Sequence, residues 1–72
     1  MKTIPRRGAI YWLWWASRSA TYIGTVITHE GKKYAFRDIC DCMIYSDPAW
    51  ARENIELYSS YKSRKGDPSN KH

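Results

Sequence analysis

The sequence TYIGTVITHEGKKYAFR, residues 21–37, contains two runs of aromatic and β-branched side chains on either side of a glycine. Such runs are typical of β-strands, and a glycine supplies the positive φ angle that a tight hairpin turn needs. The pattern predicts strands over 21–28 and 33–37, joined by a turn at 29–32. Within 21–28, threonine and isoleucine alternate with tyrosine, glycine and valine, and the pattern leaves open which of the two faces is buried.

A further strand is predicted before this hairpin, over residues 11–15, YWLWW. The polar residues 17–19, SRS, supply the turn that connects it to the strand at 21–28. Consecutive strands with such short connections pair as an antiparallel meander. The first half of the chain is therefore predicted to be a three-stranded antiparallel sheet.

After Asp38 the pattern changes from strand to helix. Asp47 followed by Pro48 is a helix start, because the carboxylate accepts hydrogen bonds from free amides and proline fits the first helical position. From there the apolar residues fall on one stripe of a helical wheel, which predicts an amphipathic helix over 48–62. Between the sheet and this helix, Asp38 either caps a short helical turn that holds Ile39, Met43 and Ile44, or begins a loop.

Together these elements predict an α+β fold, a three-stranded antiparallel sheet packed on one face by a C-terminal amphipathic helix. At 72 residues, the chain is expected to form one small domain over 1–64, with a basic arm at 1–9 and a mobile basic tail at 65–72. A single helix covers one face of a sheet. The other face, with Trp12 and Trp14, is either open to a partner or covered by the C-terminal tyrosines or by residues 38–46.

Composition and sequence pattern exclude several classes of protein. No apolar run approaches the roughly 20 residues that a membrane-spanning helix needs, so no membrane partner is expected. Two cysteines, Cys40 and Cys42, are too few for the disulfide framework of a small secreted domain. A cytoplasmic, intracellular location is expected.

Catalysis and metal binding have little support in the residues. His29 lies in the predicted turn and His72 is the last residue, so neither has a neighbour that would orient it for acid–base chemistry. A structural zinc site requires four ligands, and Cys40, Cys42 and His29 supply only three. The cysteines are expected to be buried or half-buried structural side chains. The sequence predicts a non-enzymatic protein without cofactor, metal or small-molecule substrate.

The charged residues are segregated along the chain. Twelve Lys and Arg against seven Asp and Glu give a net charge of +5. The first 37 residues sum to +6, residues 38–57 to −4 and residues 58–72 to +3. A basic sheet backed by an acidic helix favours a polyanionic partner on the sheet side.

The basic and aromatic content predicts a nucleic-acid-binding module, with duplex DNA as the preferred partner. Neutralising phosphates releases counterions, and a small sheet fits a major groove about 12 Å wide. Arg18 and Arg37 have a structural alternative, which is to pair with Asp38 or Asp41. The candidate contact residues are Arg6, Arg7, Trp12, Trp14, Arg18, Lys32, Lys33, Arg37, Lys62, Arg64 and Lys65.

Two other functions stay open at this point. A small phage-type inhibitor or adaptor that docks on a host or defence protein complex would use Trp12 and Trp14 as anchors, because tryptophan and arginine are enriched at protein interfaces. An RNA-binding sheet would instead stack bases on the aromatic side chains of an open face.

Residues 54–65, NIELYSSYKSRK, resemble the end of the arm-type DNA-binding domain at the amino terminus of lambda-like phage integrases. The order of features before them is similar too, with a basic, proline-containing arm at 4–7, an aromatic first strand and a glycine–lysine turn before an aromatic third strand. The resemblance implies a sheet inserted in the major groove and a phage or mobile-element origin. By position it implies basic contacts at Arg6, Arg7, Lys32, Lys33 and the run 62–65. It covers the DNA-binding part alone and implies no recombinase activity.

Overall fold

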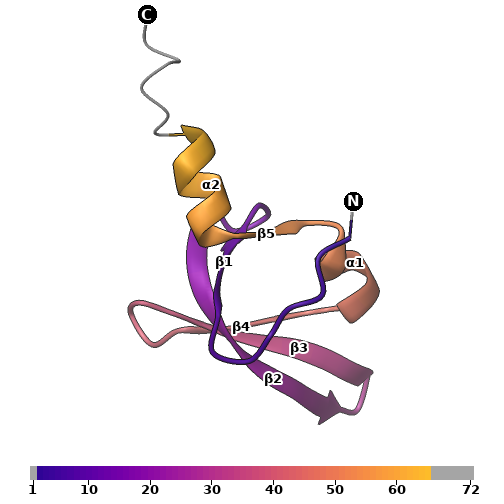
Figure 1. Cartoon of the computed structure of the whole chain (residues 1–72). Coiled ribbons are helices and arrows are strands. Elements are labelled where there is room, and N and C mark those ends of the chain that lie inside the picture. Colours follow the sequence, from indigo (N-terminus) through magenta and orange to yellow (C-terminus); the bar gives the residue numbers. More distant parts are fainter. Residues whose placement is uncertain (1, 66–72) are drawn as a thin grey trace, which may run out of the picture.

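The computed structural model describes residues 2–65, which form an α+β fold with one antiparallel sheet and two helices (Figure 1). The strand order is β4-β3-β2-β1-β5. The α+β class and the antiparallel sheet are confirmed, but the sheet has five strands rather than three. The strands are β1 (Ile10–Leu13), β2 (Arg18–Thr28), β3 (Gly31–Asp38), β4 (Met43–Ser46) and β5 (Ile55–Leu57), and the helices are α1 (Pro48–Arg52) and α2 (Tyr58–Lys65).

The predicted basic tail at 65–72 lies outside the described residues, apart from Lys65 at the end of α2. Neither helix in residues 2–65 has the length and apolar character that crossing a membrane requires.

The central hairpin forms where the sequence predicts it and is longer than predicted. β2 and β3 pair around a turn at His29 and Glu30, and Gly31 then adopts a φ angle of +113° that favours glycine. β2 begins at Arg18, because the preceding turn lies at 14–17 and not at 17–19.

The end of this hairpin projects beyond the rest of the sheet as a two-stranded ribbon, residues 26–33. β1 pairs with β2 only as far as Thr21, and β4 reaches only as far along β3 as Tyr34. The two strands of the ribbon therefore pair with each other alone. A β-bulge at Ile23, between the paired residues Tyr22 and Gly24, inserts one residue and shifts the side-chain alternation of β2.

One face of the sheet, which we call the core face, carries the hydrophobic core. Its largest fully buried side chains are Phe36 from β3 and Leu13 from β1. Burial of such side chains is the main force that stabilises the fold. The core consists of Tyr11, Leu13, Ala20, Tyr22, Tyr34, Phe36, Ala51 and Ile55.

The N-terminal segment, residues 2–9, covers part of this core. The N–H of Thr3 donates to the carbonyl of Arg52 in α1 at 2.8 Å. The N–H of Arg6 donates to the hydroxyl of Tyr11 at 2.8 Å, and Pro5 is buried. These hydrogen bonds fasten the described part of the predicted basic arm, residues 2–9, to α1 and β1.

The opposite face, which we call the α2 face, carries Ile10 and Trp12 from β1, Lys33 and Arg37 from β3, and is partly covered by α2. The rings of Trp12 and Tyr61 lie 4.2 Å apart and within 5° of parallel. Of the three arrangements left open by the sequence, cover by the C-terminal tyrosines is therefore observed, over part of this face.

The predicted helix over 48–62 is wrong, because this stretch contains two helices with a strand between them. α1 begins as predicted, with Pro48 as its first residue and the Asp47 carboxylate accepting the N–H of Trp50 at 3.1 Å. It ends after Arg52, where the side-chain amide of Asn54 donates to the Trp50 carbonyl at 2.8 Å.

The strand between the helices, β5, pairs with β1 and buries Ile55 opposite Leu13. Residues 55–57 alternate apolar, acidic and apolar, a pattern that suits a strand as well as a helical stripe. The strand conformation is favoured because pairing supplies hydrogen-bond partners for the backbone groups of β1, which would otherwise form an open edge.

The connection between β3 and β4 is a loop organised by the carboxylate of Asp38, and not a helical turn. Its Oδ1 accepts the N–H groups of Cys40 and Cys42, both at 2.9 Å, and its Oδ2 accepts from Arg18 at 2.7 Å. The Cys42 amide, with Arg18 and the Cys40 amide, holds the pKa of Asp38 below its ordinary value, although burial opposes this.

The side chains of this loop do not pack. Both cysteines are exposed free thiols, so the expectation of buried or half-buried cysteines is wrong. Ile39, which the helical-turn alternative would have held, is 95% exposed. The reason is that the backbone of the loop, and not its side chains, turns toward the buried carboxylate.

Candidate nucleic-acid interface

The two lysines of the ribbon point to opposite faces. Lys33 pairs with Val26 and Lys32 pairs with Ile27. Because side chains alternate along a strand, Lys33 and Arg37 share the α2 face, while Lys32 lies on the side of the core face. The same alternation puts Tyr34 and Phe36 on the core face, where both are buried.

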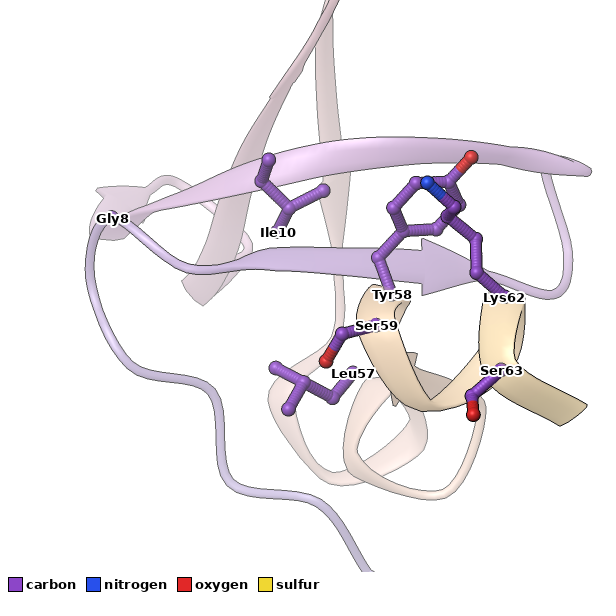
Figure 2. A pocket seen from close by; sticks show the side chains of 7 residues that line it. All are labelled: Gly8, Ile10, Leu57, Tyr58, Ser59, Lys62 and Ser63. Carbon is purple, nitrogen blue, oxygen red and sulfur yellow. The ribbon is translucent and has the colours of Figure 1, made fainter.

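Lys62 brings a third cation to the same face from α2. Its Nζ lies 5.6 Å from the centroid of the Tyr58 ring, at the i, i+4 spacing that makes two helical side chains neighbours. Figure 2 shows Tyr58 and Lys62 side by side, with Ile10 extending from β1 toward the same space.

Two adjoining hollows lie between α2 and the sheet. One, of about 610 Å³, contains Lys62, and the other, of about 380 Å³, contains Arg37. Ile10 and Tyr58 line both of them, so the two hollows meet at these side chains. The first is lined by Gly8, Ile10, Leu57, Tyr58, Ser59, Lys62 and Ser63.

The acidic neighbours of the two β3 cations are distant and hydrated. The Nζ of Lys33 is 3.8 Å from Glu30, whose side chain is 67% exposed, and the Nε of Arg37 is 3.8 Å from Asp41, whose side chain is 87% exposed. Exposed pairs at this distance contribute little, because water and salt screen them. Lys33 and Arg37 can exchange these neighbours for a stronger anion.

Two other candidate arginines are held in short ion pairs within the protein. Arg18 contacts Asp38 at 2.7 Å, which confirms the structural alternative for this residue, and joins the start of β2 to the end of β3. Arg64 contacts Glu56 at 2.7 Å and joins α2 to β5. Both guanidinium groups fasten elements of the fold together.

The remaining predicted cations, Arg6, Arg7 and Lys65, come from the N-terminal segment and the end of α2. Arg6 and Arg7 are exposed on the N-terminal segment. The guanidinium of Arg7 lies against Gly24, since a Cβ at that glycine would be 3.7 Å from its Nε. Lys65 is the last residue of α2.

The predicted aromatic pair does not form an open stacking surface. Trp12 is half-buried, stacked on Tyr61 and inclined by 20° to Tyr58. Trp14 packs edge-on against Trp12 and Tyr61 and keeps 49% of its surface exposed. On the ring face of Trp12 that Tyr61 occupies, a base could stack only by displacing α2.

Ile10 and Tyr58, which join the two hollows, are site residues that the sequence did not predict. Tyr58 belongs to the apolar stripe of the predicted helix, where it is indistinguishable from a core residue. The detectable signal was the Tyr58–Lys62 spacing, which places an aromatic ring and a cation side by side on a helix.

Within residues 2–65, His, Cys, Asp and Glu side chains do not gather in threes as a metal site would require. No protein-family model, curated protein or solved structure matches this chain.

Proposed function

We propose that this protein is a non-enzymatic module that binds duplex DNA by its α2 face, mainly through phosphates. The observation that carries the proposal is that Lys33 and Arg37 of β3 share one face with Lys62 of α2, and that Arg37 and Lys62 line adjoining hollows there. Neutralising phosphates with such cations supplies most sequence-independent affinity for DNA.

The spacing of the cations supports a duplex. Lys33 and Arg37 are four residues apart on β3, which is roughly 13 Å along a strand. This distance is close to the width of the major groove, about 12 Å, so that the two side chains can reach phosphates on its two edges. Lys62 then lies to one side, on α2.

The aromatic rings favour a duplex over single strands. Proteins that bind single-stranded nucleic acid stack bases on exposed aromatic faces. Here Trp12 and Tyr61 stack on each other, and Tyr58 lies near both Trp12 and the Lys62 ammonium. These three rings are engaged with one another and with Lys62, so the proposal assigns the contacts with the polyanion to the cations.

The resemblance of residues 54–65 to the integrase arm-type domains supports the same proposal, and with it a phage or mobile-element origin and a cytoplasmic location.

The test is the salt dependence of binding to a 20-base-pair duplex, measured by fluorescence anisotropy. Each phosphate contact contributes a slope of about −0.9 to the logarithm of the binding constant against the logarithm of salt concentration. We expect a triple variant with Lys33→Ala, Arg37→Ala and Lys62→Ala to lose most of the binding and to flatten this slope.

A matched triple variant, Lys2→Ala, Arg6→Ala and Lys32→Ala, loses the same charge outside the α2 face and is expected to keep most of the affinity. If both triple variants fold and bind alike, net charge and not the α2 face attracts the DNA, and the proposal fails. Single-stranded RNA that competes better than the duplex would also contradict it.

A protein-docking adaptor or inhibitor is the second candidate function, and one observation favours it. Ile10, Met43 and Tyr45 are exposed apolar side chains on the α2 face, and apolar patches beside positive charge are common at protein interfaces. A stoichiometric acidic protein retained at about 1 M salt after nuclease treatment would favour this function, since such salt screens phosphate contacts.

A further inference from the structure

The outer edge of β2 carries backbone groups that point away from the sheet at Thr25 and Ile27. On the far side of β3, the N–H of Asp38 donates to Cys42 in the β3–β4 connection at 3.0 Å, so the even-numbered residues of β3 bond toward β4 and the odd-numbered ones toward β2. Thr28 pairs with Gly31 and Val26 pairs with Lys33, so the backbone groups of Thr28 and Val26 point toward β3. The backbone groups of the alternate residues, Ile27 and Thr25, therefore point outward.

The N-terminal segment confirms this alternation and limits the free edge. On the other side of the β-bulge, Tyr22 also points its backbone outward, where its carbonyl accepts the N–H of Gly8 at 2.8 Å and its N–H donates to Ala9 at 3.0 Å. Within residues 2–65, no backbone hydrogen bond outside β2 and β3 reaches Thr25 or Ile27. The edge is thus occupied at Tyr22 and open from Thr25 onward.

The open edge lacks the devices that normally block strand addition. Natural edge strands carry lysine, proline or inward-pointing charge that prevents pairing. Residues 25–28, TVIT, are uncharged and β-branched throughout, which favours the extended conformation. Ile27 is 77% exposed although it lies in a regular strand.

We propose that this edge pairs with the same edge of a second copy of the chain, antiparallel and about a two-fold axis at Val26. In this register Thr25 of each copy stands opposite Ile27 of the other. Both residues have outward backbone groups, so each of the two pairs forms two hydrogen bonds. Shifting the register by one step either way leaves an outward group of Thr25 or Ile27 without such a partner.

Charge complementarity selects a second copy as the occupant. The ladder ends where the N-terminal segment begins, so the turn of the partner copy arrives beside Arg7, which lies against Gly24. That turn carries Glu30, which is exposed and of opposite charge. The ribbon lysines lie on β3, three strand spacings from their counterparts, roughly 14 Å, which exceeds the screening length of about 8 Å at physiological salt.

The axis of an antiparallel pair of this kind is perpendicular to the sheet, so both copies present the α2 face on the same side. Such a dimer doubles the number of α2-face cations that one duplex meets. The pairing itself rests on the β2 edge alone and does not depend on the proposed function.

Sedimentation equilibrium between about 10 μM and 1 mM protein tests the proposal. We expect wild type to move with concentration toward twice the 8.5 kDa mass of the chain, with a dissociation constant weaker than about 1 μM because an edge buries less than a standard interface. Ile27→Pro removes one outward N–H. An edge strand tolerates proline at such a position, and this variant is expected to be monomeric. Lys32→Pro removes the outward N–H on the opposite edge of the ribbon and is expected to dimerise like wild type.

Charge variants keep the test decisive if a proline variant fails to fold. Arg7→Glu and Glu30→Arg are each expected to weaken dimerisation about tenfold, and the double variant is expected to restore it, because the swapped charges attract again. Restoration supports the register proposed here. Wild type that stays monomeric at 1 mM overturns the proposal, and so does dimerisation that Ile27→Pro leaves unchanged. A double variant that dimerises as weakly as either single variant also overturns it.

Discussion

Two regions of the molecule use similar residues in opposite ways. One is the packed end, which consists of the hydrophobic core and the elements around it, and the other is the ribbon, residues 26–33. At the packed end, Arg18 and Arg64 form ion pairs of 2.7 Å and aromatic rings stack on one another. In the ribbon, Lys32 extends into solvent and Lys33 has only an exposed carboxylate 3.8 Å away. The count of twelve Lys and Arg therefore overstates the number of cations available to a partner. Position in the fold decides which cations can bind.

The largest expected difference between the two regions is in stability. Leu13→Ala at the packed end opens a cavity in the core, since Leu13 is 0% exposed, and is expected to lower the free energy of unfolding by about 2–5 kcal/mol. Ile27→Ala in the ribbon should change it by less than about 0.5 kcal/mol. Urea denaturation followed by tryptophan fluorescence measures both. Equal losses at the two positions would show that the ribbon is packed and not projecting.

The next effect concerns the attachment of α2. Tyr61→Ala removes the ring that stacks on Trp12 at 4.2 Å, and we expect a loss of about 1–3 kcal/mol, from ring burial together with the stacking itself. Tyr45→Ala, at an exposed tyrosine on the same sheet face, is the control. Near-UV circular dichroism should weaken for Tyr61→Ala alone, and an unchanged spectrum would mean that α2 is not held by this stack.

The loop at the packed end should respond to pH through Asp38. Its pKa is lowered in the folded protein, first by the Cys42 amide, so its carboxylate stabilises the fold above its unfolded pKa of about 3.9. That contribution is lost as the pH falls through the lowered folded pKa. We therefore expect wild type to melt above Asp38→Asn at pH 7, and the gap in Tm to close in strong acid.

Asp41→Asn is the control for this titration, because the Asp41 side chain lies in solvent at the same loop. Its melting curves should parallel those of wild type from neutral pH into acid. A gap between wild type and Asp38→Asn that stays constant down to about pH 2 would rule out the role assigned to the Asp38 carboxylate.

The smallest expected effect is the difference in duplex binding between substitutions of two cations on α2. Arg64 is paired with Glu56 and Lys62 faces the hollow beside Tyr58. We expect Lys62→Ala to weaken duplex binding about three- to tenfold and Arg64→Ala to weaken it less than about twofold, since a phosphate contact is lost only in the first. Anisotropy titrations at one salt concentration measure both. A larger loss of binding for Arg64→Ala than for Lys62→Ala would show that DNA contacts the side of α2 that carries Arg64.

Much of the sheet could be predicted because its signals are local. The glycine turn and the flanking alternation specify the β2–β3 hairpin, and Asp47 with Pro48 specifies the start of α1. The strand β5 could not be predicted, because residues 55–57 fit a helical stripe equally well. Only the edge of β1, which is distant in sequence, favours the extended form.

The candidate site was predicted as a set of residue types and not as a surface. The sequence places Lys32 and Lys33 next to each other, and only the pairing of β3 separates them onto two faces. It likewise offers Asp38 or Asp41 to Arg18, and only the fold brings the Asp38 carboxylate within 2.7 Å. Ile10 and Tyr58 meet through contacts between β1 and α2 that no local pattern encodes.

The most direct test of the α2 face as the DNA-binding surface compares the adjacent lysines of the ribbon. Lys32→Ala and Lys33→Ala remove the same charge from neighbouring positions on opposite faces, so net charge and hairpin sequence are matched. In anisotropy titrations with a 20-base-pair duplex at about 50 mM salt, we expect Lys33→Ala to raise Kd about fivefold and Lys32→Ala to change it by less than about twofold. Equal effects of the two substitutions, or a larger effect of Lys32→Ala, would contradict the account.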